Sequence, residues 1–356
     1  FAGVLMLGNG IRKAFGRSGA SDVAVVLRKG SDNEMSSGIE DQQINLVIAQ
    51  AQQVGASRAP TGVGELVVVV IADKLGTTGV SNITLRGVPE DVMKFRPSAK
   101  LIDGRLPNPG SDEVLLGAGL RGRFRNMDLG QTFELKKNRP AKIVGVFSDE
   151  GSSFESEVWA DVHSVKQAFG REGYVSSIRV RLDSASKFDA FKALVEQNRQ
   201  LGLLAIRETD YYEKASDMTA TFLTGMGKMI AFFFGMGAMI GAMITMHAAV
   251  ANRQREIGTL RALGFSRGSI LFSFLIESIL LSIFGGAIGA VASLAMGFVK
   301  ITTLNANTWS EIVFTFEPTP DIIVKALLVA GIMGLVGGFV PAWRAARISP
   351  IDAMRA

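Results

Sequence analysis

The sequence predicts an α+β domain inserted between the end of one membrane-spanning helix and a helical bundle of three further membrane-spanning helices. Hydrophobic residues make up 47% of the 356 residues, and the mean hydropathy of +0.27 is high for a soluble protein. Residues 229–250 contain no Asp, Glu, Lys or Arg, and residues 270–299 contain only Glu277. Because roughly 20 apolar residues suffice to cross the hydrocarbon core, both segments are long enough to span a bilayer.

The first segment, residues 1–9, is apolar and lacks an initial Met. We expect it to be the end of a first transmembrane helix, most of which is missing, which implies four such helices in the complete protein. A secretory signal peptide would need a basic stretch and a small-residue cleavage site, and neither is visible.

Residues 10–221 have the character of a folded domain outside the membrane. Runs rich in β-branched residues predict strands, and Gly, Pro, Asp and Asn separate them. The expected strands begin at Ser21, Glu65, Asn82, Ala141 and Ser176, and the expected helices cover residues 38–54, 162–169 and 184–198. This alternation is typical of a mixed α+β domain.

Three apolar spans follow, and the segments between them are short. We predict transmembrane helices at 222–250, 267–300 and 321–343, a connecting helix at 251–266, a loop at 301–320 and a tail at 344–356. The apolar cores of the spans are residues 224–250, 269–299 and 322–340.

The arginines of the short loops indicate the orientation of the chain. Those between the first and second spans, and those after the third, place both regions in the cytoplasm because basic loops stay inside. They are Arg253, Arg255, Arg261, Arg267, Arg344, Arg347 and Arg355. The loop that holds Glu311, Glu317 and Asp321 then lies on the opposite side, and by parity so does the α+β domain.

Methionines form a stripe along the span at 224–250. Met229, Phe232, Met236, Met239, Met243, Met246 and Val250 follow steps of three and four residues, which place them on one helix face. Flexible Met side chains either fill gaps in a helix bundle or form a surface that repacks during a transport cycle.

Small residues recur at four-residue steps, a pattern that lets helix backbones approach closely in lipid. The pairs are Gly237 and Gly241, Gly285 and Gly289, and Gly334 and Gly338. They are explained either by contact with a second permease subunit, in a homodimer or a heterodimer, or by packing within one subunit.

The segment 251–264 predicts a short amphipathic helix on the cytoplasmic side. Ile257, Leu260 and Leu263 follow helical spacing among charged residues, and Gly264 can end the helix in a left-handed conformation. Such a helix either lies on anionic headgroups or inserts into a groove of a cytoplasmic partner.

Three separated motifs carry a family resemblance: REIGTLRALGFSRGSI, ESILLSIFGGAIGA and VPAWRAARISPIDAMRA. In this order they resemble the conserved core of FtsX/MacB-type ABC permeases, the mechanotransmission or type VII group. The segments that begin at Leu101 and Glu157 resemble, more weakly, the MacB periplasmic core domain of that family.

The resemblance implies roles for individual residues. The first motif would form the coupling helix that docks into the ATPase, through Arg253, Arg255, Glu256, Ile257, Leu260, Arg261, Leu263 and Gly264. The last motif would place Pro341, Ala345 and Pro350 at the cytoplasmic end of the final span.

No catalytic residue, metal site or cofactor is expected in this chain. The phosphate-binding string G-x-x-x-x-G-K-[ST] does not occur, there is no Cys, and the two His residues, His163 and His247, are far apart in the sequence. We therefore expect ATP and Mg²⁺ to be bound by a partner, a cytoplasmic ABC ATPase dimer. The net charge of +5 reflects arginines beside the spans rather than a nucleic-acid surface.

Glu277 is unusual because a carboxylate within an apolar span is costly and often functional. It serves either as a structural hydrogen-bonding group, which we favour, or as a proton relay.

Two functions fit these patterns. The first is a permease of the bacterial inner membrane that exports a lipoprotein, peptide, glycolipid or drug, with or without a periplasmic adaptor. The second is a non-transporting regulator that activates a periplasmic cell-wall hydrolase through the same machinery. A membrane-embedded enzyme is disfavoured because paired carboxylates and nucleophiles are missing.

Overall fold

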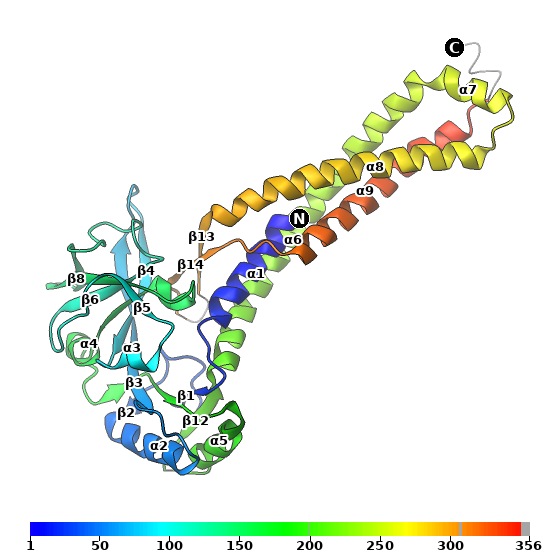
Figure 1. Ribbon diagram of the computed structural model, residues 1–356. Helices are drawn as coiled ribbons and strands as arrows, with labels where there is room; N and C mark the ends of the chain where they lie inside the picture. Colours follow the sequence, from blue (N-terminus) through cyan, green and yellow to red (C-terminus); the bar gives the residue numbers. More distant parts are fainter. Residues whose placement is uncertain (199, 306–307, 350–356) are drawn as a thin grey trace. The chain divides into compact units, whose positions relative to one another are not determined.

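A computed structural model describes residues 1–198, 200–305 and 308–349 (Figure 1). The chain divides into two compact units. One unit is an α+β domain formed by Gly10–Ala220 together with Lys300–Phe314, and the other is a helical unit formed by the remaining segments. The α+β domain therefore includes a piece of chain that lies between two transmembrane helices in the sequence.

The α+β domain is built on a ten-stranded sheet in the order β12-β1-β11-β3-β4-β9-β6-β8-β5, with β7 paired to β8. The strands are β1 (Val23–Arg28), β3 (Gly62–Asp73), β4 (Val80–Val88), β5 (Lys100–Gly104), β6 (Glu113–Gly117), β7 (Thr132–Lys136), β8 (Arg139–Ser148), β9 (Glu157–Asp161), β11 (Ser177–Arg181) and β12 (Leu203–Arg207). Strand pairs β4–β9 and β6–β8 are parallel and the others are antiparallel. Two further strands, β2 (Ile39–Glu40) and β10 (Tyr174–Val175), pair with each other.

Helices cover the sheet at two places, and each place has its own apolar core. Helices α2 (Asp41–Gln53) and α5 (Phe188–Gln197) contribute Val47 and Phe191 to a core with β1, β11 and β12. Helix α4 (Val162–Phe169) contributes Val165 to a second core with β3, β4, β6, β8 and β9. The short helix α3 (Val92–Phe95) follows β4.

The five predicted strands are confirmed as β1, β3, β4, β8 and β11. The prediction of a helix at 162–169 is confirmed as α4, which begins where the Asp161 carboxylate accepts the backbone N–H of Ser164 at 2.9 Å. The segment 184–198 divides into a 3₁₀ turn, Ala185–Lys187, and α5. Strands β5, β6, β7, β9 and β12, of five residues each, were not predicted.

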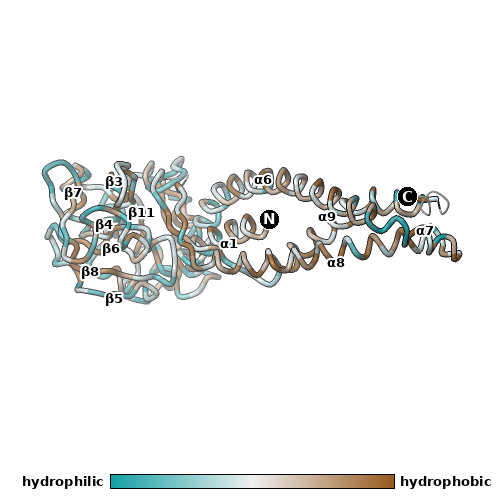
Figure 2. The backbone as a smooth tube through the Cα atoms, turned by 90° about the horizontal axis from the view of Figure 1, so that it is seen from above, coloured by the Kyte–Doolittle hydropathy of each residue, from teal (hydrophilic) through white to brown (hydrophobic). Residues whose placement is uncertain are grey.

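The helical unit contains three helices long and apolar enough to cross a membrane. They are α6 (Glu208–Asn252), α8 (Arg267–Leu294, continued by the 3₁₀ turn Ala295–Phe298) and α9 (Pro320–Ala346). Figure 2 shows apolar colouring along most of these helices. Helices α8 and α9 lie side by side (Figure 1).

Two helices extend beyond the predicted membrane segments. Helix α6 begins at Glu208, before the predicted span at 222–250, and its first part, up to Ala220, belongs to the α+β domain. Helix α1 (Ala2–Gly16) likewise continues beyond the predicted residues 1–9. The division between the two units falls at Asn9/Gly10 and at Ala220/Thr221, close to the predicted domain limits of 10 and 221.

The segment 301–320, which was predicted to be a periplasmic loop between two spans, has secondary structure of its own. It contains strands β13 (Lys300–Leu304) and β14 (Glu311–Thr315), which pair with each other. Within the α+β domain, the Ser156 hydroxyl lies 2.8 Å from the backbone N–H of Val313, which donates to it. The hydroxyl of Ser81 donates to the Glu311 carboxylate at 2.7 Å. These contacts hold the two strands on the domain.

Candidate functional site

Helix α7 (Gln254–Ala262) connects α6 to α8 and contains most of the predicted coupling segment. It ends as predicted, because Gly264 has a φ of 96°, a left-handed conformation that a residue with a Cβ rarely adopts. Helix α8 then starts at Arg267, and its N-cap is Ser266, whose hydroxyl accepts the backbone N–H of Ser269 at 3.1 Å. The connector is therefore a defined helix with its own ends.

One side of α7 is anchored in an apolar cluster. Ile257, only 2% exposed, packs with residues from the ends of all three long helices. They are Met246 and Val250 of α6, Ile270 and Phe274 of α8, and Ala342, Ala345 and Ala346 of α9. The apolar cluster therefore joins α7 to the ends of α6, α8 and α9.

The other apolar residues of the connector face outward. Leu260 is 41% exposed, Leu263 74% and Phe265 52%. The sequence pattern placed Ile257, Leu260 and Leu263 on one face, but only Ile257 is buried. We call the exposed residues Leu260, Leu263 and Phe265 the α7 surface. Beside this surface, Nη1 of Arg261 donates to the Phe265 carbonyl at 3.3 Å, and this bond fixes the turn after the helix.

The charged residues of the predicted coupling segment border this surface. Arg255 and Glu256 are exposed on α7, and Arg253 lies directly before the helix, at its N-cap. The Nη1 atom of Arg253 donates to the Glu277 carboxylate, at 3.2 Å from Oε1 and 3.3 Å from Oε2. Glu277 thus has a structural partner, and this contact ties the start of α7 to α8.

The six predicted packing glycines divide into two groups. An added Cβ at Gly334 or Gly338 would collide with Ser282 or Ser278 of α8, and the Ser278 hydroxyl donates to the Gly334 carbonyl at 2.7 Å. This pair packs within the subunit. An added Cβ would meet nothing within 4 Å at the other four positions, which are Gly237, Gly241, Gly285 and Gly289.

The Met stripe of α6 divides in a similar way. Met246 and Val250 are buried in the apolar cluster, whereas Met229, Phe232 and Met236 are exposed. Of the C-terminal motif, Pro341 and Ala345 are buried in α9, and Pro350 lies outside the described residues.

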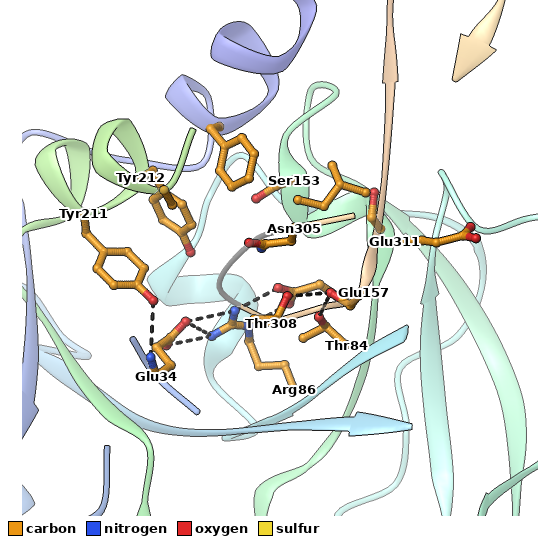
Figure 3. A pocket seen from close by; sticks show the side chains of 15 residues that line it. Glu34, Thr84, Arg86, Ser153, Glu157, Tyr211, Tyr212, Asn305, Thr308 and Glu311 are labelled. Atoms are coloured by element: carbon orange, nitrogen blue, oxygen red, sulfur yellow. Dashed lines mark hydrogen bonds and ion pairs between the residues drawn. The ribbon is translucent and has the colours of Figure 1, made fainter. Parts of the chain in front are cut away.

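A second candidate site, which sequence reasoning missed, is a cluster of buried charges in the α+β domain. We call it the charge cluster; it consists of Arg86, Arg96, Arg179, Glu34, Glu65, Glu157 and Glu208, each less than 9% exposed. Figure 3 shows Glu34 and Glu157 pointing at the Arg86 guanidinium, with Tyr211 turned toward Glu34. The sequence signal was a single charge within an apolar strand, as with Arg86 in NITLRGV.

The cluster is held together by directional hydrogen bonds. Arg86 binds Glu157 through two parallel bonds, Nε to Oε2 at 2.7 Å and Nη2 to Oε1 at 2.8 Å, the strongest geometry for this pair. Its Nη1 also donates to Glu65 at 2.8 Å and to Glu34 at 3.0 Å. The Phe154 ring lies beneath the arginines, 4.2 Å from Arg96 Cζ and 5.2 Å from Arg86 Cζ.

The arginines keep two of these carboxylates, Glu34 and Glu65, ionised despite burial. Burial alone would raise the pKa of Glu34, but Arg179 and Arg86 outweigh it and lower this pKa to about 2. The pKa of Glu65 is likewise lowered by Arg96, Arg179 and Arg86 against the effect of burial. Glu34 and Glu65 are therefore ionised at neutral pH.

Comparisons with known proteins relate both halves of the chain to one group of transporters. Residues 1–198 match the family model described as MacB-like periplasmic core domain. Residues 228–350 match the model described as FtsX-like permease C-terminal. The second match contains α7, α8 and α9, and the first contains all of the charge cluster except Glu208.

The relatives described here are identical to the chain at less than a third of the aligned positions. A macrolide export ATP-binding/permease protein MacB of Pectobacterium atrosepticum is 31% identical over 60% of this chain and 33% of its own length. The MacB of Neisseria gonorrhoeae is 27% identical over 99% of this chain and 55% of its own length. The chain thus spans between a third and about half of the length of these relatives.

Among solved structures, the periplasmic region of MacB from Actinobacillus actinomycetemcomitans matches 56% of this chain and 94% of its own, at 16% identity and a TM-score of 0.39. The extracellular domain of the ABC-type transporter YknZ matches 52% of this chain and 99% of its own, at 17% identity and a TM-score of 0.38. Likeness at this level bears on neither substrate nor mechanism.

Proposed function

Because this chain belongs to the FtsX/MacB-type ABC permease family, with a MacB-like periplasmic core domain and an FtsX-like permease C-terminal region, we propose that it couples a cytoplasmic ATPase to movement of its periplasmic domain. The observation that carries the proposal is the two-sided character of α7. One side is anchored by Ile257 in the ends of three long helices, and the other presents the α7 surface.

The first step of the proposed mechanism is docking of the ATPase on the α7 surface. Exposed apolar side chains on a short amphipathic helix suit insertion into a groove of a partner, and an exposed Leu263 and Phe265 gain free energy when they are covered. ATP and Mg²⁺ would be bound by that partner. Closure of an ATPase dimer would then displace α7.

The second step is transfer of this displacement to the long helices. Ile257 belongs to one apolar cluster with residues of α6, α8 and α9, and Arg253 joins the start of α7 to α8 through Glu277. Packed interiors transmit strain because they are dense and hardly compressible. Helix α6 runs without a break from Glu208 to Asn252, and its first part belongs to the α+β domain.

The proposed transported molecule is one already in the periplasm or in the outer leaflet of the inner membrane, such as a lipoprotein, peptide, glycolipid or drug. The relatives named for macrolide export support transport over regulation of a hydrolase. Substrate would be moved by the periplasmic domain, so the proposal requires no pore in the membrane.

The test is ATPase stimulation in proteoliposomes that contain the full chain and the ATPase that co-purifies with it. We expect the double variant L263S/F265S to lose most of the stimulation, because docking depends on the apolar side chains. Leu75, 56% exposed in the α+β domain, provides the matched control, and L75S should behave as the parent does. Undiminished stimulation in L263S/F265S would contradict the proposal.

A further inference from the structure

The charge cluster gathers side chains from every part of the α+β domain around the first residues of α6. Glu65 comes from β3, Arg86 from β4, Glu157 from β9 and Arg179 from β11. Glu208 is the first residue of α6. Helix α6 thus starts inside a network of charges that belongs to the sheet.

Glu208 is held from three separate segments. Its Oε2 accepts the backbone N–H of Ala20 at 3.0 Å, and its Oε1 accepts Arg96 Nη1 at 3.3 Å. The same Oε1 atom also accepts Nη1 of Arg179. Glu208 is only 1% exposed, so water cannot replace a bond that is lost.

The next turn of α6 is held in the same way. The Tyr212 hydroxyl accepts Arg179 Nη2 at 3.1 Å, and the Tyr211 hydroxyl accepts the backbone N–H of Glu34 at 3.3 Å. The Tyr212 ring packs edge-on against Phe154, with the ring centroids 5.6 Å apart. The start of α6 therefore has polar contacts on several sides.

The end of α1 meets α6 at the same place. An added Cβ on Gly19 would lie 2.8 Å from Thr209 Cα and 2.9 Å from the Glu208 carbonyl oxygen. Only a glycine permits this close approach of two backbones. Phe15 of α1 also lies beside Tyr212, at a centroid distance of 6.4 Å.

Charge is an unusual way to fasten a helix, since burying ions costs solvation that apolar packing does not. What the ions add is direction, because a guanidinium fork bonds a carboxylate only at fixed angles. A helix held by apolar contacts can slide or turn by exchanging neighbours, whereas a turn of α6 here would break the buried bonds of Glu208 to Arg96 and Arg179.

We infer that Glu208 is a positioning residue that fixes the start of α6 rigidly to the sheet, so that the domain follows the helix. This inference rests on the proposed function, in which α6 transmits motion. The charge cluster then acts as a stiff joint between α6 and the sheet. A contribution to stability alone would not explain why the cluster is made of charges.

The joint can be measured because the chain has no Cys, so spin labels attach only at introduced thiols. The pair K142C and K214C places one label on exposed β8 and one on an exposed position of the first part of α6. Double electron–electron resonance on the full chain in detergent then gives the distribution of distances across the joint.

The variant is E208Q, and its matched control is E157Q. Both remove one buried carboxylate that binds arginine, but only Glu208 belongs to α6. We expect a single narrow distribution in the labelled parent and in E157Q, and at least a twofold broader one in E208Q. Equal widths in E208Q and the parent, or equal broadening in E208Q and E157Q, would overturn the inference.

If E208Q does not accumulate as folded protein, Y212F replaces it, because this change removes one hydrogen bond of the joint and keeps the ring. Broadening in Y212F relative to E157Q supports the joint, and parent-like width in Y212F overturns it. ATPase stimulation should stay at the parent level in E208Q. Its loss in L263S/F265S is a separate result, so failure of the joint and failure of the proposed function are distinguishable.

Discussion

Helix α6 is held by opposite chemistry at its two ends. Its last turns pack into the apolar cluster around Ile257, while its first turn is bonded into the charge cluster through Glu208. Next to the apolar end lies the exposed α7 surface of Leu260, Leu263 and Phe265, whereas the charged end is buried. This difference suggests that one end is built to receive a partner and the other to stay fixed.

The largest expected effect comes from disrupting the charge cluster at the start of α6. R179M removes the guanidinium that contacts Glu34, Glu65 and Glu208. Removing one partner of a buried ion network costs roughly 3–5 kcal/mol, because the remaining charges are left without compensation. We expect the free energy of unfolding, measured with denaturant on the full chain in detergent, to fall by about this amount.

Lys142, exposed on β8, gives the control for that measurement. K142M should change the free energy of unfolding by less than about 0.5 kcal/mol. If R179M and K142M lowered the free energy of unfolding by the same small amount, the charges at the start of α6 would not form an interdependent network.

The next effect breaks the apolar end. I257A deletes a side chain buried among α6, α8 and α9, and large-to-small changes of this kind cost about 2–5 kcal/mol. We expect only the structure around α7 to be destabilised. Hydrogen exchange should therefore accelerate in α7 and stay unchanged in β11. Acceleration in both regions would mean that the two ends are not independent.

A pH series distinguishes the two ends by their chemistry. The pKa of Glu34 is about 2 in the folded chain, against an ordinary value of 4.5. The folded state therefore binds fewer protons than the unfolded state, and the stabilisation is complete above pH 4.5 and declines as the pH falls toward 2. The free energy of unfolding of the α+β domain should therefore decrease as the pH falls from 4.5 toward 2.

Hydrogen exchange across the same acid titration provides the contrast. The core of α7 and its neighbours is apolar, so exchange in α7, corrected for its intrinsic pH dependence, should change less than exchange in β11. A larger loss of protection in α7 than in β11 would contradict the contrast between the two ends.

The smallest expected effect concerns Glu277. Its contact with Arg253 is partly exposed, with side-chain accessibilities of 35% and 49%, and such pairs contribute about 0–1 kcal/mol. E277Q should therefore change the melting temperature little and leave ATPase stimulation intact. Abolished transport with normal assembly and ATPase activity would instead favour a proton relay.

Much of the helical unit could be predicted from the sequence because lipid-spanning helices need long apolar runs, and a run such as 270–299 is plain. The left-handed end of α7 at Gly264 was predictable for a similar local reason. Beyond the apolar spans, hydropathy gave no signal that α1 and α6 continue.

The charge cluster could not be predicted because its members are remote in sequence. Glu34, Arg86 and Arg179 come together only when β4 and β11 join one sheet. A charge within an apolar strand, such as Arg86, is a local signal of burial, but it does not identify the residues that pair with it. For the predicted coupling residues, spacing predicted a helix but not which of Ile257, Leu260 and Leu263 is buried.

The most direct test of the proposed coupling is cross-linking from the α7 surface. A photoreactive amino acid at position 263 should form an adduct with the ATPase in native membranes, and the same group at Leu75 should not. An adduct between position 263 and a periplasmic protein, or no adduct with the ATPase while the complex is intact, would contradict the account.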